Sequence, residues 1–311
     1  MPAGTPALLA VKLTRMRRAS SIVAAILPAF TPGKSGLSMS TEKKSGNILL
    51  RIRDARRECV EHRKRVLPLV ALKMAVEKKA SPARDFVGAL TAKRINVIAE
   101  LKKKSPSRGL IRQNFNATHL ATELADAGAA ALSVLTEEEF FSGSLVDLKE
   151  ARTAVQIPVL RKDFIFDPWQ VWEARAAGAD SFLLIVSLLD GELLGDLLEL
   201  GRQLKMEALV EVHSADEIGT ALDCGAKIVG VNNRDLTNFE VRLETALGLA
   251  DKIPESCVAV AESGIGSSED LDVLSRAGFD AFLIGEHLMK QDSPGDALRS
   301  LLSGVTARSE K

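Results

Sequence analysis

Short apolar runs recur at regular intervals along most of this 311-residue chain. Each is four to six residues long, is almost continuously apolar or β-branched, and leaves room for one helix before the next. The runs cover residues 97–101, 131–136, 158–162, 181–186, 208–212, 227–231, 258–262 and 281–285. Strands that are buried on both faces have this pattern, and parallel strands need crossover helices between them.

Eight strand-helix units within about 200 residues predict an α/β fold, a closed (β/α)8 barrel, preceded by an amphipathic, charged segment over residues 47–79. A longer repeat supports this prediction. Gly128, Gly178, Gly225 and Gly278 are spaced 50, 47 and 53 residues apart, and each stands just before an even-numbered strand. Glycine there suits the left-handed residue that ends a helix. A doubly wound open sheet is the alternative.

The charge of the chain is divided unevenly along its length. There are 41 basic and 41 acidic residues, yet residues 1–40 hold five basic residues and no acid. The rest of the chain therefore has 36 basic against 41 acidic residues. An acid-free leader rich in Arg, Ser and Ala is typical of an organelle transit peptide, which we place at residues 1–45, with the barrel over 46–311. A secretory signal with residues 22–30 as its apolar core, or an untargeted tail, is the alternative.

Composition excludes several classes of protein. Balanced charge argues against a nucleic-acid-coating protein, and 13 aromatic residues without Tyr argue against base stacking. No apolar stretch reaches the roughly 20 residues that span a membrane. Cys59, Cys224 and Cys257 are too far apart in sequence for a zinc motif or a disulfide framework.

Polar residues at the carboxyl ends of the expected strands are the candidate active site, because barrel enzymes build their sites there. They are Glu100, Lys102, Lys162, Glu211, Asn232, Arg234, Glu262, Ser263 and Gly285. A barrel mouth does not need these charges for stability, and burying them unpaired costs several kcal/mol each. We therefore expect them to contact one another and a polar ligand.

Two parts of this mouth carry further predictions. Glu100 and Lys102 alternate onto the same face of their strand, and Ser105 begins a mobile loop able to cover a substrate. Small residues after the last two strands, in segments 262–266 and 284–287, would let backbone N–H groups bind a phosphate. Tight turns that need glycine for backbone reasons alone are the other interpretation of these two segments.

Six segments closely resemble the signature sequences of indole-3-glycerol phosphate synthase, in that family's order and spacing. They are residues 99–107, 140–145, 160–165, 209–213, 231–236 and 261–265. The resemblance extends over about residues 47–303 and includes extra amino-terminal helices before the first strand. It implies ring closure of 1-(o-carboxyphenylamino)-1-deoxyribulose 5-phosphate with loss of CO2 and water, in tryptophan biosynthesis, without cofactor or metal.

The resemblance also implies roles for individual residues. Lys162 would be the general acid of ring closure, Glu211 the general base, and Lys102 a second ammonium that pairs with substrate anions and serves dehydration. Either lysine is open to either proton transfer. The remaining catalytic residues are Glu100 and Asn232, which would position these groups, and Arg234, which would lie near the anthranilate carboxylate.

The substrate-binding residues follow from the same motifs. Ser105 belongs to the covering loop, and Phe141 and Phe164 are expected beside the aromatic ring of the substrate, with core packing as the alternative. The expected phosphate ligands are Ser263, Gly264, Gly285 and Glu286. The Glu286 side chain should point away, because it is an acid beside a dianion. Repulsion between the two ammonium groups would lower the pKa of each lysine, while Glu100 and Glu211 would restore the charged form. A lysine pKa shifted toward neutrality is the state expected to be useful for an acid.

Other interpretations of the strand-end lysines stay open. Lys102 or Lys162 could form a Schiff base with a ketose phosphate, as in aldolase-type barrels, and a barrel that only binds a sugar phosphate is a further alternative. We expect a small-molecule substrate and neither nucleic acid nor membrane as partner, and we consider a monomer that hands its product to tryptophan synthase. Tryptophan synthesis in photosynthetic eukaryotes is plastidial, so the family resemblance favours the plastid stroma over the mitochondrion or cytoplasm.

Overall fold

The computed structural model describes residues 48–79, 81–92, 95–235 and 239–305. The described residues all belong to one compact unit, which lies within Ser45–Lys311. The expected leader at residues 1–45 lies outside the described residues and stays a prediction.

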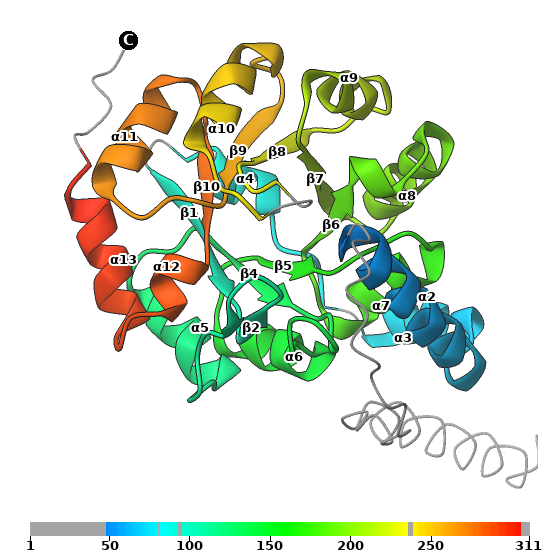
Figure 1. Ribbon diagram of the computed structural model, residues 1–311. Helices are drawn as coiled ribbons and strands as arrows, with labels where there is room; N and C mark the ends of the chain where they lie inside the picture. The colour runs from blue at the N-terminus through cyan, green and yellow to red at the C-terminus, as the bar shows by residue number, and fades with distance from the viewer. Residues whose placement is uncertain (1–47, 80, 93–94, 236–238, 306–311) are drawn as a thin grey trace, which may run out of the picture. The chain divides into compact units, whose positions relative to one another are not determined.

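Eight parallel strands close into a barrel in the order β1, β10, β9, β8, β7, β6, β5, β4 (Figure 1). The strands are β1 (Asn96–Leu101), β4 (Ala131–Leu135), β5 (Val159–Lys162), β6 (Ser181–Ile185), β7 (Glu207–Val212), β8 (Ile228–Asn232), β9 (Val258–Glu262) and β10 (Ala281–Ile284). Each coincides with one expected strand to within a residue or two. The (β/α)8 barrel is confirmed, and the open sheet is wrong because β1 pairs with both β4 and β10.

Helices surround the barrel and return the chain to the amino-terminal ends of the strands (Figure 1). They are α5 (Ala117–Asp126), α6 (Leu145–Ala154), α7 (Pro168–Ala177), α8 (Gly191–Gln203), α9 (Ala215–Asp223), α10 (Leu243–Leu249), α11 (Ser268–Arg276), α12 (Glu286–Met289) and α13 (Pro294–Ser303). Short 3-10 turns, η1 (Val186–Leu188) and η2 (Ala250–Lys252), follow β6 and α10. The predicted left-handed glycines are confirmed, with φ of 99° at Gly128, 95° at Gly178, 81° at Gly225 and 113° at Gly278.

Three helices precede the barrel: α2 (Ile48–Val66), α3 (Leu69–Lys79) and α4 (Phe86–Leu90). The charged segment at 47–79 is therefore two helices, because Pro68 has no N–H to continue the first one. Helix α3 packs against α7, where Trp169 is buried with Leu72 and donates a 2.9 Å hydrogen bond to the Leu67 carbonyl. These contacts fix the amino-terminal helices to the side of the barrel.

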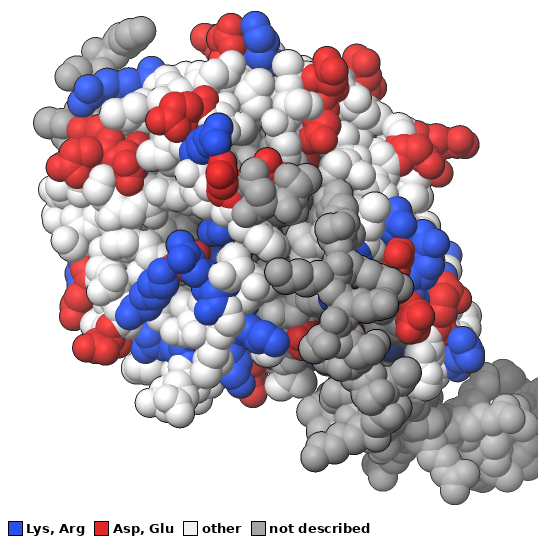
Figure 2. Space-filling model, in the orientation of Figure 1, with Lys and Arg blue, Asp and Glu red and all other residues white. Residues whose placement is uncertain are grey.

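The loop after β1 forms a short antiparallel hairpin of β2 (Lys104–Ser105) and β3 (Gly109–Leu110). On the face seen in Figure 1, Lys and Arg side chains gather in the region of β2 and α12, while acidic side chains are frequent over α8 to α11 (Figure 2). Part of the barrel mouth, near β2 and α12, therefore carries a basic region.

Candidate active site

The carboxyl ends of five strands place charged or polar side chains around one cavity of roughly 520 Å³. Glu100 comes from β1, Lys162 from β5, Glu211 from β7, Asn232 from β8 and Glu262 from β9. Each of these positions ends an apolar strand or lies next to its end. Barrel closure brings them together although they are as much as 162 residues apart in sequence.

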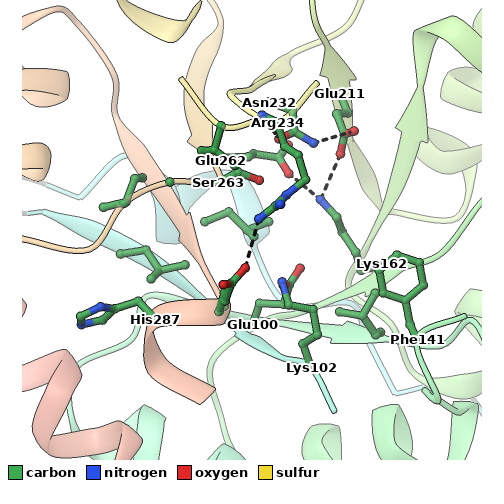
Figure 3. A pocket seen from close by; sticks show the side chains of 18 of the residues that line it. Glu100, Lys102, Phe141, Lys162, Glu211, Asn232, Arg234, Glu262, Ser263 and His287 are labelled. Atoms are coloured by element: carbon green, nitrogen blue, oxygen red, sulfur yellow. Dashed lines mark hydrogen bonds and ion pairs between the residues drawn. The ribbon is translucent and has the colours of Figure 1, made fainter. Parts of the chain in front are cut away.

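The ammonium group of Lys162 occupies the centre of this arrangement (Figure 3). Its Nζ lies 3.1 Å from Glu211 Oε2 and 2.5 Å from Glu262 Oε2. Glu211 Oε1 in turn accepts a 3.0 Å hydrogen bond from Asn232 Nδ2. Both carboxylates are buried, at 3% and 1% side-chain exposure, so their attraction for the ammonium is little screened by water.

Electrostatics at Lys162 correct one expectation. Burial alone would lower the pKa of Lys162, but the carboxylates of Glu262, Glu211 and Glu100 raise it above its ordinary value. The prediction of a pKa shifted toward neutrality is therefore wrong for Lys162. The sequence argument set the repulsion between the two lysines against Glu100 and Glu211 and did not include Glu262. In this structure Lys162 is a firmly protonated group.

The two carboxylates beside Lys162 differ from each other. Burial would raise the pKa of Glu211, but Lys162 and His213 hold it below its usual value. Burial raises the pKa of Glu262, to about 7, against the attraction of Lys162 and with repulsion from Glu211 and Glu100. Glu211 is therefore the carboxylate of the two that is ionised at neutral pH, as a general base must be before it accepts a proton.

A second ion pair between a lysine and a glutamate lies at the end of β1. Lys102 Nζ is 2.6 Å from Glu100 Oε2, which confirms that the two side chains share one face of the strand. Gly285 makes room for this pair, because a Cβ there would come within 2.2 Å of Glu100 Oε2. The glycine at 285 thus has a packing role in addition to the phosphate contact expected for its N–H.

Arg234 extends over the cavity from the end of β8. Its backbone N–H donates to Asn232 Oδ1 at 3.0 Å, and its Nη2 lies 3.1 Å from Glu286 Oε2 (Figure 3). Glu286 also pairs with Arg108 at 3.0 Å and Lys290 at 2.6 Å. These three cations hold the Glu286 side chain at the rim of the cavity, and its direction relative to a bound phosphate stays a prediction.

Two aromatic rings line the apolar side of the site. The centroids of Phe141 and Phe164 are 6.0 Å apart, with the rings inclined at 39°. Both rings border the main cavity and a smaller one next to it, which is also lined by Ile52 and Ser105. Ser105 itself belongs to β2, so the segment expected to be a mobile loop begins as an ordered hairpin.

The turns after β9 and β10 form the opposite wall of the cavity. Ser263 and Gly264 both have positive φ, at 67° and 83°. At Gly264 a Cβ would also come within 2.5 Å of Val241 Cγ1, so only glycine fits there. Ser263, Gly264, Gly285 and Glu286 thus lie together on one side of the cavity, and phosphate binding by them stays a prediction.

Glu262 was one of the strand-end candidates, but the sequence argument gave it no catalytic or binding role. The signal was present, since an acid ends an otherwise apolar strand. Its carboxylate fills space that Gly230 leaves open on β8, where a Cβ would lie 2.2 Å from Glu262 Oε1. Glu262 Oε1 has no hydrogen-bond partner among the described residues.

The residues on either side of Lys162 point away from the cavity into a buried ionic network. Arg161 Nη2 lies 2.9 Å from Asp163 Oδ2 and 2.8 Å from Glu173 Oε2, and Arg56 of α2 contacts Asp163 at 2.6 Å. The side chains of Arg161 and Asp163 are completely buried. Burial alone would raise the pKa of Asp163, but Arg56 and Arg161 lower it to about 2. The network ties β5 to α2 and α7.

The described residues form neither a metal cluster nor a membrane-spanning helix. Within the described ranges, no cluster of three or more His, Cys, Asp or Glu side chains is placed to hold a metal ion. No described helix combines the length and apolarity needed to cross a bilayer. The three cysteines are free thiols.

A protonated lysine between carboxylates, at the carboxyl ends of the strands of a (β/α)8 barrel, defines an acid-base enzyme. The family profile described as indole-3-glycerol phosphate synthase matches residues 49–301. Enzymes with that name from Burkholderia ambifaria and Acidithiobacillus ferrooxidans are each 47% identical to this chain. The first match covers 81% of this chain and 97% of the relative, and the second covers 82% and 98%. The chain belongs to the indole-3-glycerol phosphate synthase family.

Solved structures support the fold independently. A 3-hexulose-6-phosphate synthase superposes with a TM-score of 0.57 at 15% identity, over 68% of this chain and all of that one. At this identity the likeness concerns the barrel alone. Family membership makes the chain a carboxy-lyase of tryptophan biosynthesis.

Proposed function

We propose that the cavity converts 1-(o-carboxyphenylamino)-1-deoxyribulose 5-phosphate to indole-3-glycerol phosphate, CO2 and water. The observation that carries this proposal is the Lys162 ammonium, held between Glu211 and Glu262 inside the cavity. Ring closure needs an acid that protonates the ketone oxygen while the arene carbon attacks, and dehydration needs a base that removes a proton. A charged ammonium and a low-pKa carboxylate 3.1 Å apart supply both.

Lys162 is the acid of ring closure in this proposal, and Glu211 is the base. A raised lysine pKa is compatible with the acid role, because the alkoxide that develops from the ketone is a far stronger base than an amine. Lys102, paired with Glu100, is the second ammonium and the acid of dehydration. Asn232 orients Glu211 through their 3.0 Å hydrogen bond.

The walls of the cavity match the three parts of this substrate. The turns with Ser263, Gly264, Gly285 and Glu286 would bind the phosphate through backbone N–H groups. Arg234 would pair with the carboxylate of the anthranilate portion. The rings of Phe141 and Phe164 would border the substrate ring, and Ser105 would cover it from the hairpin of β2 and β3. Such a substrate places two anions beside the basic rim of an acidic barrel.

The aldolase-type alternative is disfavoured by the same geometry. A lysine must lose its proton to attack a ketone, whereas two buried carboxylates keep Lys162 protonated. Borohydride trapping with substrate present tests the point. A covalent adduct on Lys162 would count against the acid role.

The direct test is to add the carboxyphenylamino ketose phosphate to the purified chain and follow the growth of indole fluorescence. Lys162→Ala and Glu211→Gln should each lower kcat at least ~100-fold, which is the usual contribution of a general acid or base. Normal turnover by both variants would show that the assigned roles are wrong.

The subcellular location of the protein is a separate part of the proposal. The acid-free composition of residues 1–40 supports import into the plastid stroma and removal of a leader at residues 1–45. Intact leader on cytosolic protein would contradict it. We further propose that the barrel works as a monomer that passes its product to tryptophan synthase. Sedimentation of the chain alone, and with that enzyme, tests both statements.

A further inference from the structure

His213 links the active site to the outer surface of the barrel. It follows β7 two residues after Glu211, and its imidazole lies between two carboxylates. Nε2 is 3.6 Å from Glu211 Oε1, and Nδ1 is 3.5 Å from Glu217 Oε2 on α9. His213 and Glu217 are one-fifth exposed, whereas Glu211 is buried. The three side chains therefore form a continuous row from the cavity to solvent.

Two observations indicate that this row of side chains could carry a proton. The backbone N–H of His213 donates a 2.6 Å hydrogen bond to Glu217 Oε2, which fixes the outer carboxylate beside the ring. The inner ring atom, Nε2, is buried and has no hydrogen-bond partner in the part of the chain that the structure describes. A small rotation of the ring brings Nε2 within hydrogen-bond distance of Glu211, because ordinary N–H···O bonds extend to about 3.2 Å.

The charge around the ring favours a proton source there. The carboxylates that act on His213 are Glu211 of β7, Glu217 of α9 and Glu262 of β9. Burial lowers the pKa of His213, but these carboxylates outweigh it and raise the pKa above its ordinary value. The imidazole is therefore more readily charged near neutral pH than an ordinary histidine.

The reaction itself needs a proton from outside. The substrate carboxylate leaves as neutral CO2, so each turnover consumes one proton overall. The acids give one proton to the ketone oxygen and one to the departing hydroxyl, while the base recovers only one from carbon. Lys162 or Lys102 must therefore be protonated again from solvent before the next turnover.

We propose that His213 is a positioning residue that acts through Glu211 and admits this proton from the surface. The Nε2–H bond of the imidazolium breaks and an O–H bond forms at Glu211 Oε1. After rotation of the carboxyl group, the proton passes from Glu211 to the neutral amine of Lys162. The imidazole is then neutral, with its remaining proton on Nδ1, and it regains the imidazolium charge when the partly exposed ring turns outward and Nε2 takes a proton from a solvent or buffer acid. The proposal rests on the roles given above to Lys162 and Glu211.

The first test separates the first turnover from later ones. In the full chain, His213→Gln should leave the first-turnover rate near that of the wild type, because Lys162 begins protonated. Its steady-state rate should fall at least ~10-fold, short of the ~100-fold or larger effect of losing a direct acid or base. Glu217→Gln keeps an acceptor for the His213 N–H and should show a smaller loss of the same kind. Asp216→Asn, on the same exposed turn, is the matched control and should change neither rate.

The second test is rescue by a proton donor in the buffer. Raising the imidazole concentration at constant pH and ionic strength should restore the steady-state rate of His213→Gln and leave the wild type unchanged. Three results would each refute the proposed entry of the proton through His213: an equal loss in first and later turnovers, no loss at all, or a loss that buffer does not restore. A normal first turnover in Glu211→Gln would instead refute the proposed function, whatever His213 does.

Discussion

Gly230 lies on β8 inside the barrel, and its missing side chain leaves the space that Glu262 fills. In Gly230→Ala the new Cβ would lie 2.2 Å from Glu262 Oε1 and 3.0 Å from Leu209 Cδ1. Ordinary contact begins at 3.4 Å, so the carboxylate must retreat by about 1.2 Å. A shift of that size disrupts the 2.5 Å contact between Glu262 and Lys162.

The expected cost has two parts. Overpacking of a filled interior destabilises by about 1–3 kcal/mol, and misplacing a catalytic group by about 1 Å lowers the rate about 100-fold. Urea unfolding followed by circular dichroism measures the first, and kcat from indole fluorescence measures the second. Gly219→Ala is the matched control, because Gly219 is an exposed position of α9 with no atom near the added Cβ. There the same substitution should stabilise by about 0.5–1 kcal/mol, since alanine suits a helix better.

Opposite signs of the two stability changes are the central expectation. If Gly230→Ala has the same free energy of unfolding and the same kcat as the wild type, Glu262 is free to move and its contact with Lys162 does not matter for activity. If both variants lose stability equally, the loss does not come from the crowding of Glu262.

The remaining predictions concern pH. Glu262→Gln removes a carboxylate that raises the pKa of Lys162, so the basic limb of kcat against pH should move to lower pH, and an unmoved limb contradicts this. The pKa of Asp163 is about 2 in the folded protein and about 3.9 in an unfolded chain. Its stabilising contribution is therefore complete above pH ~4 and is lost as the pH falls toward 2. Acid unfolding of Asp163→Asn should lack this component; identical pH slopes for variant and wild type would refute it.

The strands could be predicted from sequence because each is buried on both faces and reads as a continuous apolar run. The left-handed glycines could also be predicted, because glycine is the residue type that most readily adopts a positive φ at the end of a helix. Alternation within a single strand also sufficed to pair Glu100 with Lys102. In each case the information lies within a few neighbouring residues.

Interactions across the barrel could not be predicted in this way. Lys162 and Glu262 are 100 residues apart and come from strands that are not neighbours, so their contact depends on how the barrel closes. Among the carboxylates that raise the pKa of Lys162, Glu262 has the largest effect. Arg56 and Asp163, 107 residues apart, meet because α2 packs against the barrel. Nothing in the local pattern of either segment specifies that partner.

The alternation along the end of β5 has a consequence for accuracy in folding. Arg161 and Asp163 are committed to one side of the strand by the buried ionic network, and Lys162 is committed to the other by two carboxylates. A slip of the strand by one position would turn the lysine outward and bring a guanidinium or a carboxylate into the cavity. Both sets of ion pairs would then break together. A barrel with β5 misaligned would therefore lose both sets of ion pairs, so the aligned strand, with Lys162 in the cavity, is the more stable arrangement.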